Sequence, residues 1–352
     1  MEDILKRTIE LLEGNTVAVW AGVVAQEGST PRKTAARMLI SADGDTLGSV
    51  GGGRLEAEVM EAARALADSR GSRLMDISLS GREVAETDMI CGGHARIYVE
   101  TLLPENLGFL RELQERIAAR KRVALLTWID EKKAFKDSHF ILDPDDMENG
   151  LDRLPPSIRE EVEHALGKGE ASGVIPCPGE EGLLYLEPLK AAPLLHIFGG
   201  GHISVDLAWF AHRVGFQVVV VDDREEFANR ERFPMAVAVK ARPYGEVLAT
   251  TGFGEDDYVV IVTRGHLYDL DVLRGVVREN TRYTGMIGSR RKRAMIYEQL
   301  LKEGVPQERL DRVHAPIGLD IGAETPAEIA ASTVAELIGV LREGRRKKRQ
   351  VW

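Results

Sequence analysis

Three consecutive glycines follow an apolar run, Leu194–Phe198, and precede a segment typical of a helix, Ile203–Val214. Strand, glycine turn and helix in this order match the dinucleotide-binding fingerprint G-x-G-x-x-G/A. Gly199 would permit the tight turn, and Gly201 would let the backbone approach a pyrophosphate. The helix N-terminus then offers N–H groups and a favourable dipole to the phosphates. The pattern predicts a phosphate-binding turn; the alternative is a turn that only packs a strand against a helix.

The residues around this turn refine the prediction. His202 opens the helix, and Ser204 replaces the third small residue of the fingerprint. A second strand, Gln217–Val221, leads to Asp222, whose carboxylate can accept hydrogen bonds from ribose hydroxyls. An acidic side chain there also repels a 2′-phosphate. We therefore expect NAD or another nucleotide with an unphosphorylated ribose.

Polar residues follow two further strands of the same region. After the expected strand Tyr283–Ile287, Ser289 can cap a helix and contact an anion. Arg290 and Arg291 can neutralise phosphate, unless they only form the solvated start of a basic helix. After the preceding strand, His266 is a candidate catalytic proton carrier or ligand, or else a surface histidine.

A glycine loop in the first half of the chain has an adjacent cation. It comprises Gly51, Gly52, Gly53 and Arg54, and a second small-residue loop follows Gly28. Backbone amides in such loops form concavities that bind anions. The sequence therefore predicts a second anion site, in which Arg54 adds positive charge.

Cys91 is the candidate metal ligand. Two glycines follow it and leave room for a bulky ligand, and the nearby His94 can lower the pKa of the thiol. A soft thiolate suits a metal such as molybdenum better than hard oxygen ligands do. The alternative is a small buried hydrophobic residue, which is our interpretation of Cys177. Because the sequence has no C-x-x-C or H-x-x-H cluster, zinc is not expected.

Alternating strands and helices must position these residues. After Pro193 the alternation is regular, which predicts a Rossmann-like, doubly wound parallel sheet over 193–343. Residues 1–130 are typical of an N-terminal α/β domain, and residues 131–192 of an irregular connecting region with some structure of its own. Residues 344–352 form a basic tail, and no internal repeat is evident. The predicted fold class is α/β.

Composition narrows the classes of function. A formal charge of -10 argues against nucleic-acid binding, which requires a basic surface. The basic run Arg345–Arg349 is either a solvated tail or a contact for an anionic partner. The N-terminus lacks the features of a signal peptide, and no apolar run approaches the roughly 20 residues of a membrane helix. We expect a cytoplasmic protein without a membrane partner.

Six short stretches, in this order along the chain, carry the motifs of one known family. They are Gly28–Arg32, Gly48–Gly53, Cys91–Gly93, Phe198–His202, Gly288–Lys292 and Ala315–Pro326. Together they resemble the XdhC/CoxI family, the xanthine dehydrogenase accessory factors that help to mature molybdenum hydroxylases. Six ordered matches are far more specific than a single glycine loop.

The resemblance implies a cofactor-binding chaperone rather than a free-standing enzyme. Such proteins bind the molybdenum cofactor (molybdopterin), cooperate with a cysteine desulfurase that installs the terminal sulfido ligand, and deliver the cofactor to the apo molybdenum hydroxylase. By position, Cys91 becomes the thiol near molybdenum. Arg54 stands where many family members have a cysteine, and it would contact the anionic phosphate or dithiolene of the pterin. We also expect a homo-oligomer.

An NAD-dependent oxidoreductase is the alternative function. It would use the Rossmann domain through Gly199, Gly201 and Asp222, and it would not require Cys91. The same glycine turn serves dehydrogenases, methyltransferases and carriers, so the turn alone does not decide between these functions.

Overall fold

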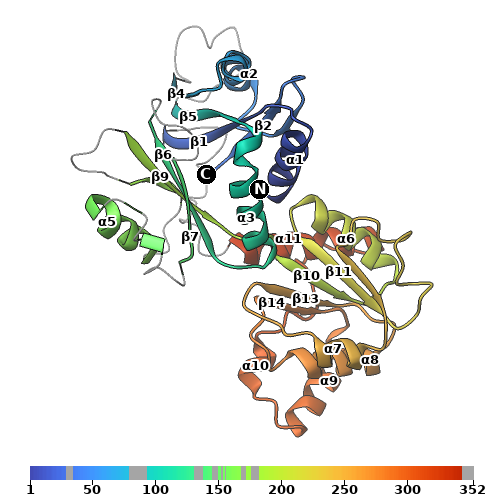
Figure 1. Cartoon of the computed structure of the whole chain (residues 1–352). Coiled ribbons are helices and arrows are strands. Elements are labelled where there is room, and N and C mark those ends of the chain that lie inside the picture. The colour runs from blue at the N-terminus through green and yellow to red at the C-terminus, as the bar shows by residue number, and fades with distance from the viewer. Residues whose placement is uncertain are drawn as a thin grey trace. The chain divides into compact units, whose positions relative to one another are not determined.

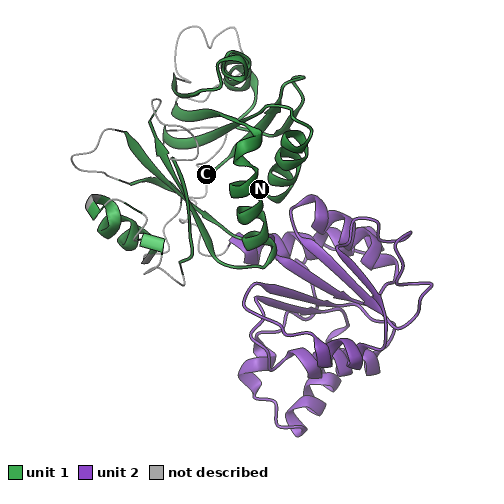
Figure 2. Cartoon of the chain, in the orientation of Figure 1, with its two compact units in different colours: residues 1–191 green, residues 192–352 purple. Residues whose placement is uncertain are grey.

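The computed structural model describes residues 1–28, 35–78, 93–130, 138–144, 150–151, 154, 156–167, 172–175 and 182–342. The chain divides into two compact units, Met1–Ala191 and Ala192–Trp352, which Figure 2 colours separately. None of the described helices combines the length and hydropathy needed to cross a membrane. Cys91, Cys177 and the basic tail 344–352 lie outside the described residues.

The second unit is a doubly wound parallel sheet, as the sequence predicts. Its strands are β10 (Leu194–Phe198), β11 (Gln217–Asp222), β12 (Ala238–Ala241), β13 (Asp257–Ile261) and β14 (Tyr283–Met286). They lie in the order β12-β11-β10-β13-β14, and every neighbouring pair is parallel. Strands buried on both faces need nearly continuous apolar residues, which is why β10, β11, β13 and β14 are recognisable in the sequence.

Helices cover both faces of this sheet (Figure 1). They are α6 (His202–Arg213), α7 (Tyr244–Thr250), α8 (His266–Val276), α9 (Arg290–Lys302), α10 (Gln307–Asp311) and α11 (Pro326–Arg342). One apolar core contains Ile197 of β10 together with Leu207 and Leu337, from α6 and α11. The other contains the next strand residue, Phe198, together with Val272 of α8 and residues of α7, α9 and α10. Alternate strand residues therefore supply the two cores.

The first unit contains, among its described residues, two antiparallel sheets. The first sheet and the helices of the same segment are α1 (Glu2–Glu13), β1 (Ala18–Gly28), β2 (Arg37–Ser41), β3 (Thr46–Gly48), α2 (Gly53–Ser69), β4 (Ser72–Ser78) and β5 (Gly93–Leu102). Those that follow are α3 (Leu107–Ala118), β6 (Val123–Ile129), β7 (His139–Leu142), α5 (Pro156–Gly167), β8 (Gly173–Ile175) and β9 (Leu183–Leu189). The sheet orders are β3-β2-β1-β5-β4 and β7-β6-β9-β8.

These two halves of the first unit share one topology. Apart from β3, which has no counterpart among the described residues of the second half, the order α1-β1-β2-α2-β4-β5 recurs as α3-β6-β7-α5-β8-β9. Each corresponding strand pair is antiparallel. The turn after the first helix also recurs, because Asn15 and Arg120 both have φ of 57°. The structure thus contains an internal repeat of topology that the sequence does not reveal.

Residues 131–192 were expected to form an irregular connecting region. In the structure they supply most of the elements of the second half of the first unit. They contribute β7, α5, β8 and β9, and residues such as Ile158, Val162 and Leu184 belong to one apolar core with Leu126 of β6. The prediction underestimated this region because β7 and β8 span only four and three residues. Strands this short contain too few residues for a periodic pattern to stand out.

Two buried side-chain contacts join the two sheets of the first unit. Arg37 at the start of β2 contacts Glu187 of β9 at 2.5 Å, and His139 at the start of β7 contacts Glu100 of β5 at 3.2 Å. Each pair links one half to the other, and the four residues hold corresponding places in the repeated topology. A small pocket lies beside Arg37, Glu100 and Glu187.

Candidate functional site

Helices α6, α8 and α9 are three of the helices that begin at the carboxyl edge of the parallel sheet in the second unit. Helices α6, α8 and α9 follow β10, β13 and β14 after short loops, with Gly201, Gly265 and Ser289 as their N-caps. The first-turn N–H groups of a helix have no partner within the helix, and the N-terminus carries a partial positive charge. This edge therefore presents three sets of N–H groups suited to an anionic ligand.

The three glycines after β10 have different environments. A Cβ on Gly199, where φ is +113°, would collide with the carbonyl oxygen of Val262, and one on Gly200 would collide with that of Phe227. A Cβ on Gly201 would meet no described atom within 4 Å. The first two glycines are therefore required by the packing of the chain itself. Only Gly201 leaves space for a ligand against the backbone.

The two predicted contacts at the start of α6 differ in exposure. Ser204 is buried, and its hydroxyl donates a hydrogen bond of 2.6 Å to the carbonyl of Gly199. It stabilises the glycine turn from inside, so its hydroxyl is engaged by the protein. His202 is the first residue of α6 and is exposed. The role of either residue as a direct ligand contact stays a prediction.

Asp222 at the end of β11 is fully buried and already paired. Its carboxylate accepts hydrogen bonds from the backbone N–H of Gly200 at 2.8 Å and from Nε and Nη2 of Arg224 at 2.9 and 3.1 Å. Burial opposes ionisation, but the bonds from Arg224 and Gly200 outweigh it, and the pKa of this carboxyl lies below its usual value. Ribose binding by Asp222 stays a prediction. It would require ribose hydroxyls to replace Gly200 or Arg224 as hydrogen-bond donors to the carboxylate.

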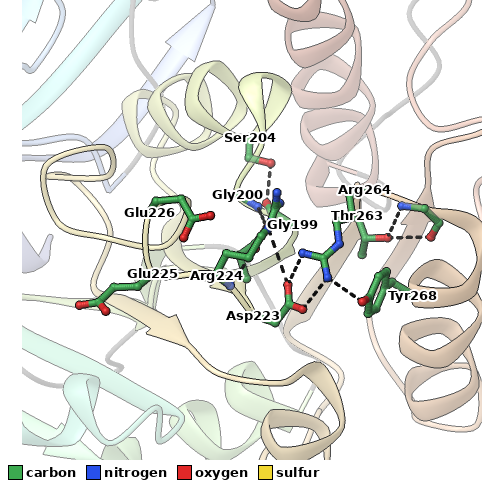
Figure 3. Close-up of polar contacts among 12 residues, drawn as sticks. Gly199, Gly200, Ser204, Asp223, Arg224, Glu225, Glu226, Thr263, Arg264 and Tyr268 are labelled. Carbon is green, nitrogen blue, oxygen red and sulfur yellow. Dashed lines mark hydrogen bonds and ion pairs between the residues drawn. The ribbon is translucent and has the colours of Figure 1, made fainter.

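Two arginines that the sequence reasoning did not select lie at the same place. Figure 3 shows Arg264, from the loop after β13, bound to Asp223 through both guanidinium Nη atoms, at 3.0 and 2.8 Å. Arg264 also donates to the hydroxyl of Tyr268, whose ring lies under its guanidinium. The guanidinium of Arg224 lies 3.7 Å from the ring centroid of Phe227. Pairs between residues 41 positions apart leave no local signal in a sequence.

The predicted basic helix start is confirmed as a helix N-terminus, with Ser289 as its cap. The Ser289 hydroxyl accepts a hydrogen bond from the backbone N–H of Lys292 at 3.2 Å. Arg290 and Arg291 are both exposed on the first turn of α9. They are therefore accessible to a ligand phosphate, although their binding role stays a prediction.

A buried aspartate connects the loop after β13 to α9. Asp269 accepts hydrogen bonds from the backbone N–H and the hydroxyl of Thr263, at 3.2 and 2.6 Å, and it pairs with the ammonium group of Lys292. His266 lies nearby in sequence, exposed at the first position of α8. The structure therefore places His266 at the predicted edge, and its catalytic role stays a prediction.

His314 forms an isolated β-bridge with Gly285 of β14. Glu336 of α11 holds His314 and the segment that follows it in place. It accepts hydrogen bonds from the hydroxyl of Tyr283 at 2.5 Å and the N–H of Gly318 at 2.9 Å, and it lies 2.9 Å from Nδ1 of His314. Burial opposes ionisation, yet these partners outweigh it and lower the pKa of the carboxyl. This partly buried cluster gives the family-like stretch Ala315–Pro326 a structural role.

In the first unit, the chain's own carboxylate occupies the predicted anion-binding turn. Glu56, in the first turn of α2, accepts hydrogen bonds from the hydroxyl of Ser49 at 2.6 Å and the N–H of Gly52 at 3.0 Å. Partial burial opposes ionisation, but these bonds lower the pKa of Glu56. Arg54 is exposed and pairs with Glu58 at 2.7 Å. Binding of an external anion by Gly51–Gly53 and Arg54 stays a prediction.

The proposed thiol site lies outside the described residues, as does the loop 29–34. Among the residues that the structure does describe, no group of three or more His, Cys, Asp or Glu side chains is arranged to bind a metal ion. Metal binding by Cys91 therefore stays a prediction.

The fold and the carboxyl-edge site define a protein with a Rossmann-type domain and a separate N-terminal α/β unit. Residues 195–337 match the family model of the XdhC Rossmann domain, and residues 11–78 match that of the XdhC and CoxI family. The chain therefore belongs to the XdhC and CoxI family.

Similar proteins extend this likeness over the whole chain. A probable xanthine dehydrogenase subunit from Bacillus subtilis is 27% identical over 331 residues, which cover 93% of this chain and 94% of that protein. The uncharacterized protein YqeB from Escherichia coli is 25% identical over 96% of this chain, but the match spans only 46% of YqeB. A crystal structure described as a xanthine dehydrogenase from Bacillus halodurans superposes with a TM-score of 0.77, at 25% identity, over 99% of this chain and 98% of that one.

Proposed function

We propose that this chain is an accessory factor for a molybdenum hydroxylase of the xanthine dehydrogenase type. It binds the molybdenum cofactor as cargo, supports its sulfuration together with a cysteine desulfurase, and delivers it to the apo-hydroxylase. The family and the names of its relatives support the association with xanthine dehydrogenase. The observation that carries the proposal is that α6, α8 and α9 all begin at one edge of the sheet.

This edge has the chemistry that the phosphate of molybdopterin requires. The backbone at Gly201 is open to a ligand, and Arg290 and Arg291 are exposed on the first turn of α9. Charge-assisted hydrogen bonds from guanidinium groups add to the N–H groups of the helix ends. His266, at the start of α8, would supply or accept a proton during handover of the cargo.

Cys91 supplies the soft ligand in this proposal. A thiolate binds molybdenum more strongly than the hydroxyl and carboxylate oxygens of the glycine loops would. Cys177 is the matched control because it is the chain's other cysteine. Replacing either residue with serine changes the side-chain volume little while it removes the soft sulfur.

Metal and pterin analysis tests the proposal directly. The chain is purified from a host that makes molybdenum cofactor, and molybdenum and pterin are measured per chain for the wild type, Cys91→Ser and Cys177→Ser. We expect the wild type and Cys177→Ser to retain both, and Cys91→Ser to lose most of the molybdenum and to activate an apo-hydroxylase poorly. Thermal melting controls for folding. A wild type without molybdenum or pterin contradicts cargo binding, and full occupancy in Cys91→Ser contradicts the thiol ligand alone.

An NAD-dependent oxidoreductase is the second candidate, because the open Gly201 after β10 also suits a dinucleotide pyrophosphate. The two functions differ in the bound molecule. Nicotinamide absorbance in the purified chain, without molybdenum or pterin, would favour the oxidoreductase.

A further inference from the structure

The acidic end of β11 presents arginines, rather than free carboxylates, at the ligand edge. Both oxygens of Asp222 accept hydrogen bonds from Arg224 or the Gly200 N–H, and both oxygens of Asp223 accept from Arg264. Each carboxylate is therefore matched by a guanidinium. An unphosphorylated ribose is expected only if a carboxylate at this strand end is unpaired, and in the structure both carboxylates are paired with arginines.

The position of Arg264 follows from the strand order. Strand β10 lies between β11 and β13, so a side chain that starts after β13 and reaches Asp223 after β11 must pass the end of β10. The glycine turn with the open Gly201 follows β10. In a doubly wound sheet, the ligand binds where the strand order reverses, beside this turn. Arg264 is thus held against the expected position of a nucleotide.

The two guanidinium groups keep hydrogen-bonding capacity for a ligand. An arginine has five N–H donors. Arg224 uses Nε and Nη2 on Asp222, and no acceptor for its Nη1 is found among the described residues. The side chains of Arg224 and Arg264 are 27% and 35% exposed, so both can be reached from solvent. Aromatic rings under both guanidinium groups restrict their motion and pre-orient the donors.

We propose that Arg224 and Arg264 make this edge selective for a nucleotide whose ribose carries a phosphate monoester. An arginine near the end of the second strand is the usual means by which such folds accommodate a 2′-phosphate. The fork of N–H donors matches phosphate oxygens better than ribose hydroxyls, because charge-assisted bonds are the stronger ones. The inference rests on the proposed function only in taking this carboxyl edge as the ligand site.

Two nearby glutamates do not oppose this selectivity. Glu225 and Glu226 are exposed, and in the view of Figure 3 they lie on the other side of Arg224 from Arg264. Exposed charges are screened by salt over about 8 Å at physiological ionic strength. A phosphate would therefore bind through the guanidinium N–H donors that Asp222 and Asp223 leave unused.

Calorimetry with NADP⁺ and NAD⁺ on the purified full chain tests the inference, because the two ligands differ only in the 2′-phosphate. We expect NADP⁺ to bind at least about tenfold more tightly than NAD⁺. Arg264→Gln should lower NADP⁺ affinity about tenfold and leave NAD⁺ affinity nearly unchanged. Arg264→Gln is preferred to Arg224→Gln, which would leave the buried Asp222 without its ion pair.

Arg282→Gln is the matched control, because Arg282 is exposed just before β14, at the opposite edge of the same sheet. It removes the same charge and should preserve the NADP⁺ preference. Equal affinities, tighter NAD⁺ binding or no binding of either nucleotide would overturn the inference. Molybdenum and pterin content, measured on the same preparations, separates this result from the proposed function. Retained cofactor without an NADP⁺ preference refutes only the selectivity.

Discussion

The glycine turns Gly51–Gly53 and Gly199–Gly201 look alike in the sequence and differ in what occupies them. Both precede a helix, but α2 has an acidic residue in its first turn and α6 has none. In the first turn, that residue, Glu56, accepts the N–H of Gly52. In the second, the carboxylate comes from the neighbouring strand and binds Gly200, which leaves Gly201 open. A glycine turn thus predicts where an anion can bind. An acidic residue in the first turn of the following helix indicates that the chain's own carboxylate binds there.

Replacing the carboxylate that binds each glycine turn should have the largest effect on the free energy of unfolding. The size of that effect should also differ most between the two turns. Asp222→Asn breaks a buried ion pair and is expected to lower the free energy of unfolding by about 3 kcal/mol at pH 7. Glu56→Gln weakens hydrogen bonds at a partly exposed site and is expected to cost about 1 kcal/mol. Denaturant unfolding of the full chain measures both. A larger loss for Glu56→Gln would reverse the comparison.

The stability difference between the wild type and each of these two variants should depend on pH. The pKa values of Asp222 and Glu56 lie below their ordinary values of 3.8 and 4.5, so each charged carboxylate stabilises the fold above those values. This stabilisation disappears as the pH falls through the folded-state pKa. The difference between the wild type and each variant should therefore be constant near pH 7 and shrink under acid conditions. A difference that grows on acidification would contradict the assigned hydrogen bonds.

The next largest effect concerns the glycines themselves. Gly200→Ala would place a Cβ against the backbone oxygen of Phe227 and should destabilise the chain by about 2 kcal/mol. Gly52→Ala meets no described atom within 4 Å, but φ of +80° imposes roughly 1 kcal/mol of backbone strain. Thermal unfolding of the two variants gives the comparison. Gly201→Ala should melt like the wild type, because its space is open and its φ is -69°.

The predictability of the fold differs between the two units for a physical reason. Strands buried on both faces, such as β10 and β11, form apolar runs that alternate with helices, so the Rossmann-like unit was recognisable. The repeat in the first unit was not, because its halves share topology and almost no sequence. At the start of the halves, Leu5 and Glu10 recur as Leu110 and Glu115 while most of their neighbours differ. Packing tolerates many apolar residues at one position, so topology survives without sequence identity.

The site shows the same division between local and distant contacts. The cap at Ser289 was predictable because its partner, the N–H of Lys292, lies three residues away. The pairing of Asp223 with Arg264 was not, because it depends on which strands become neighbours. Sequence reasoning therefore predicted the helix starts at the carboxyl edge but missed the arginines that pair with the carboxylates at the end of β11.

The smallest expected effect belongs to Arg54 in the first turn. Its side chain is exposed and forms an i,i+4 pair with Glu58, and such pairs contribute about 0.3–0.5 kcal/mol. Because Glu56 already binds the turn, we expect Arg54→Ala to change stability within that range and to leave molybdenum and pterin content unchanged. Arg291→Ala, which removes an exposed arginine from the start of α9, should lower cofactor content without changing the melting temperature. Cofactor loss in Arg54→Ala alone would show that the first turn, despite its own carboxylate, is the one that binds the cargo.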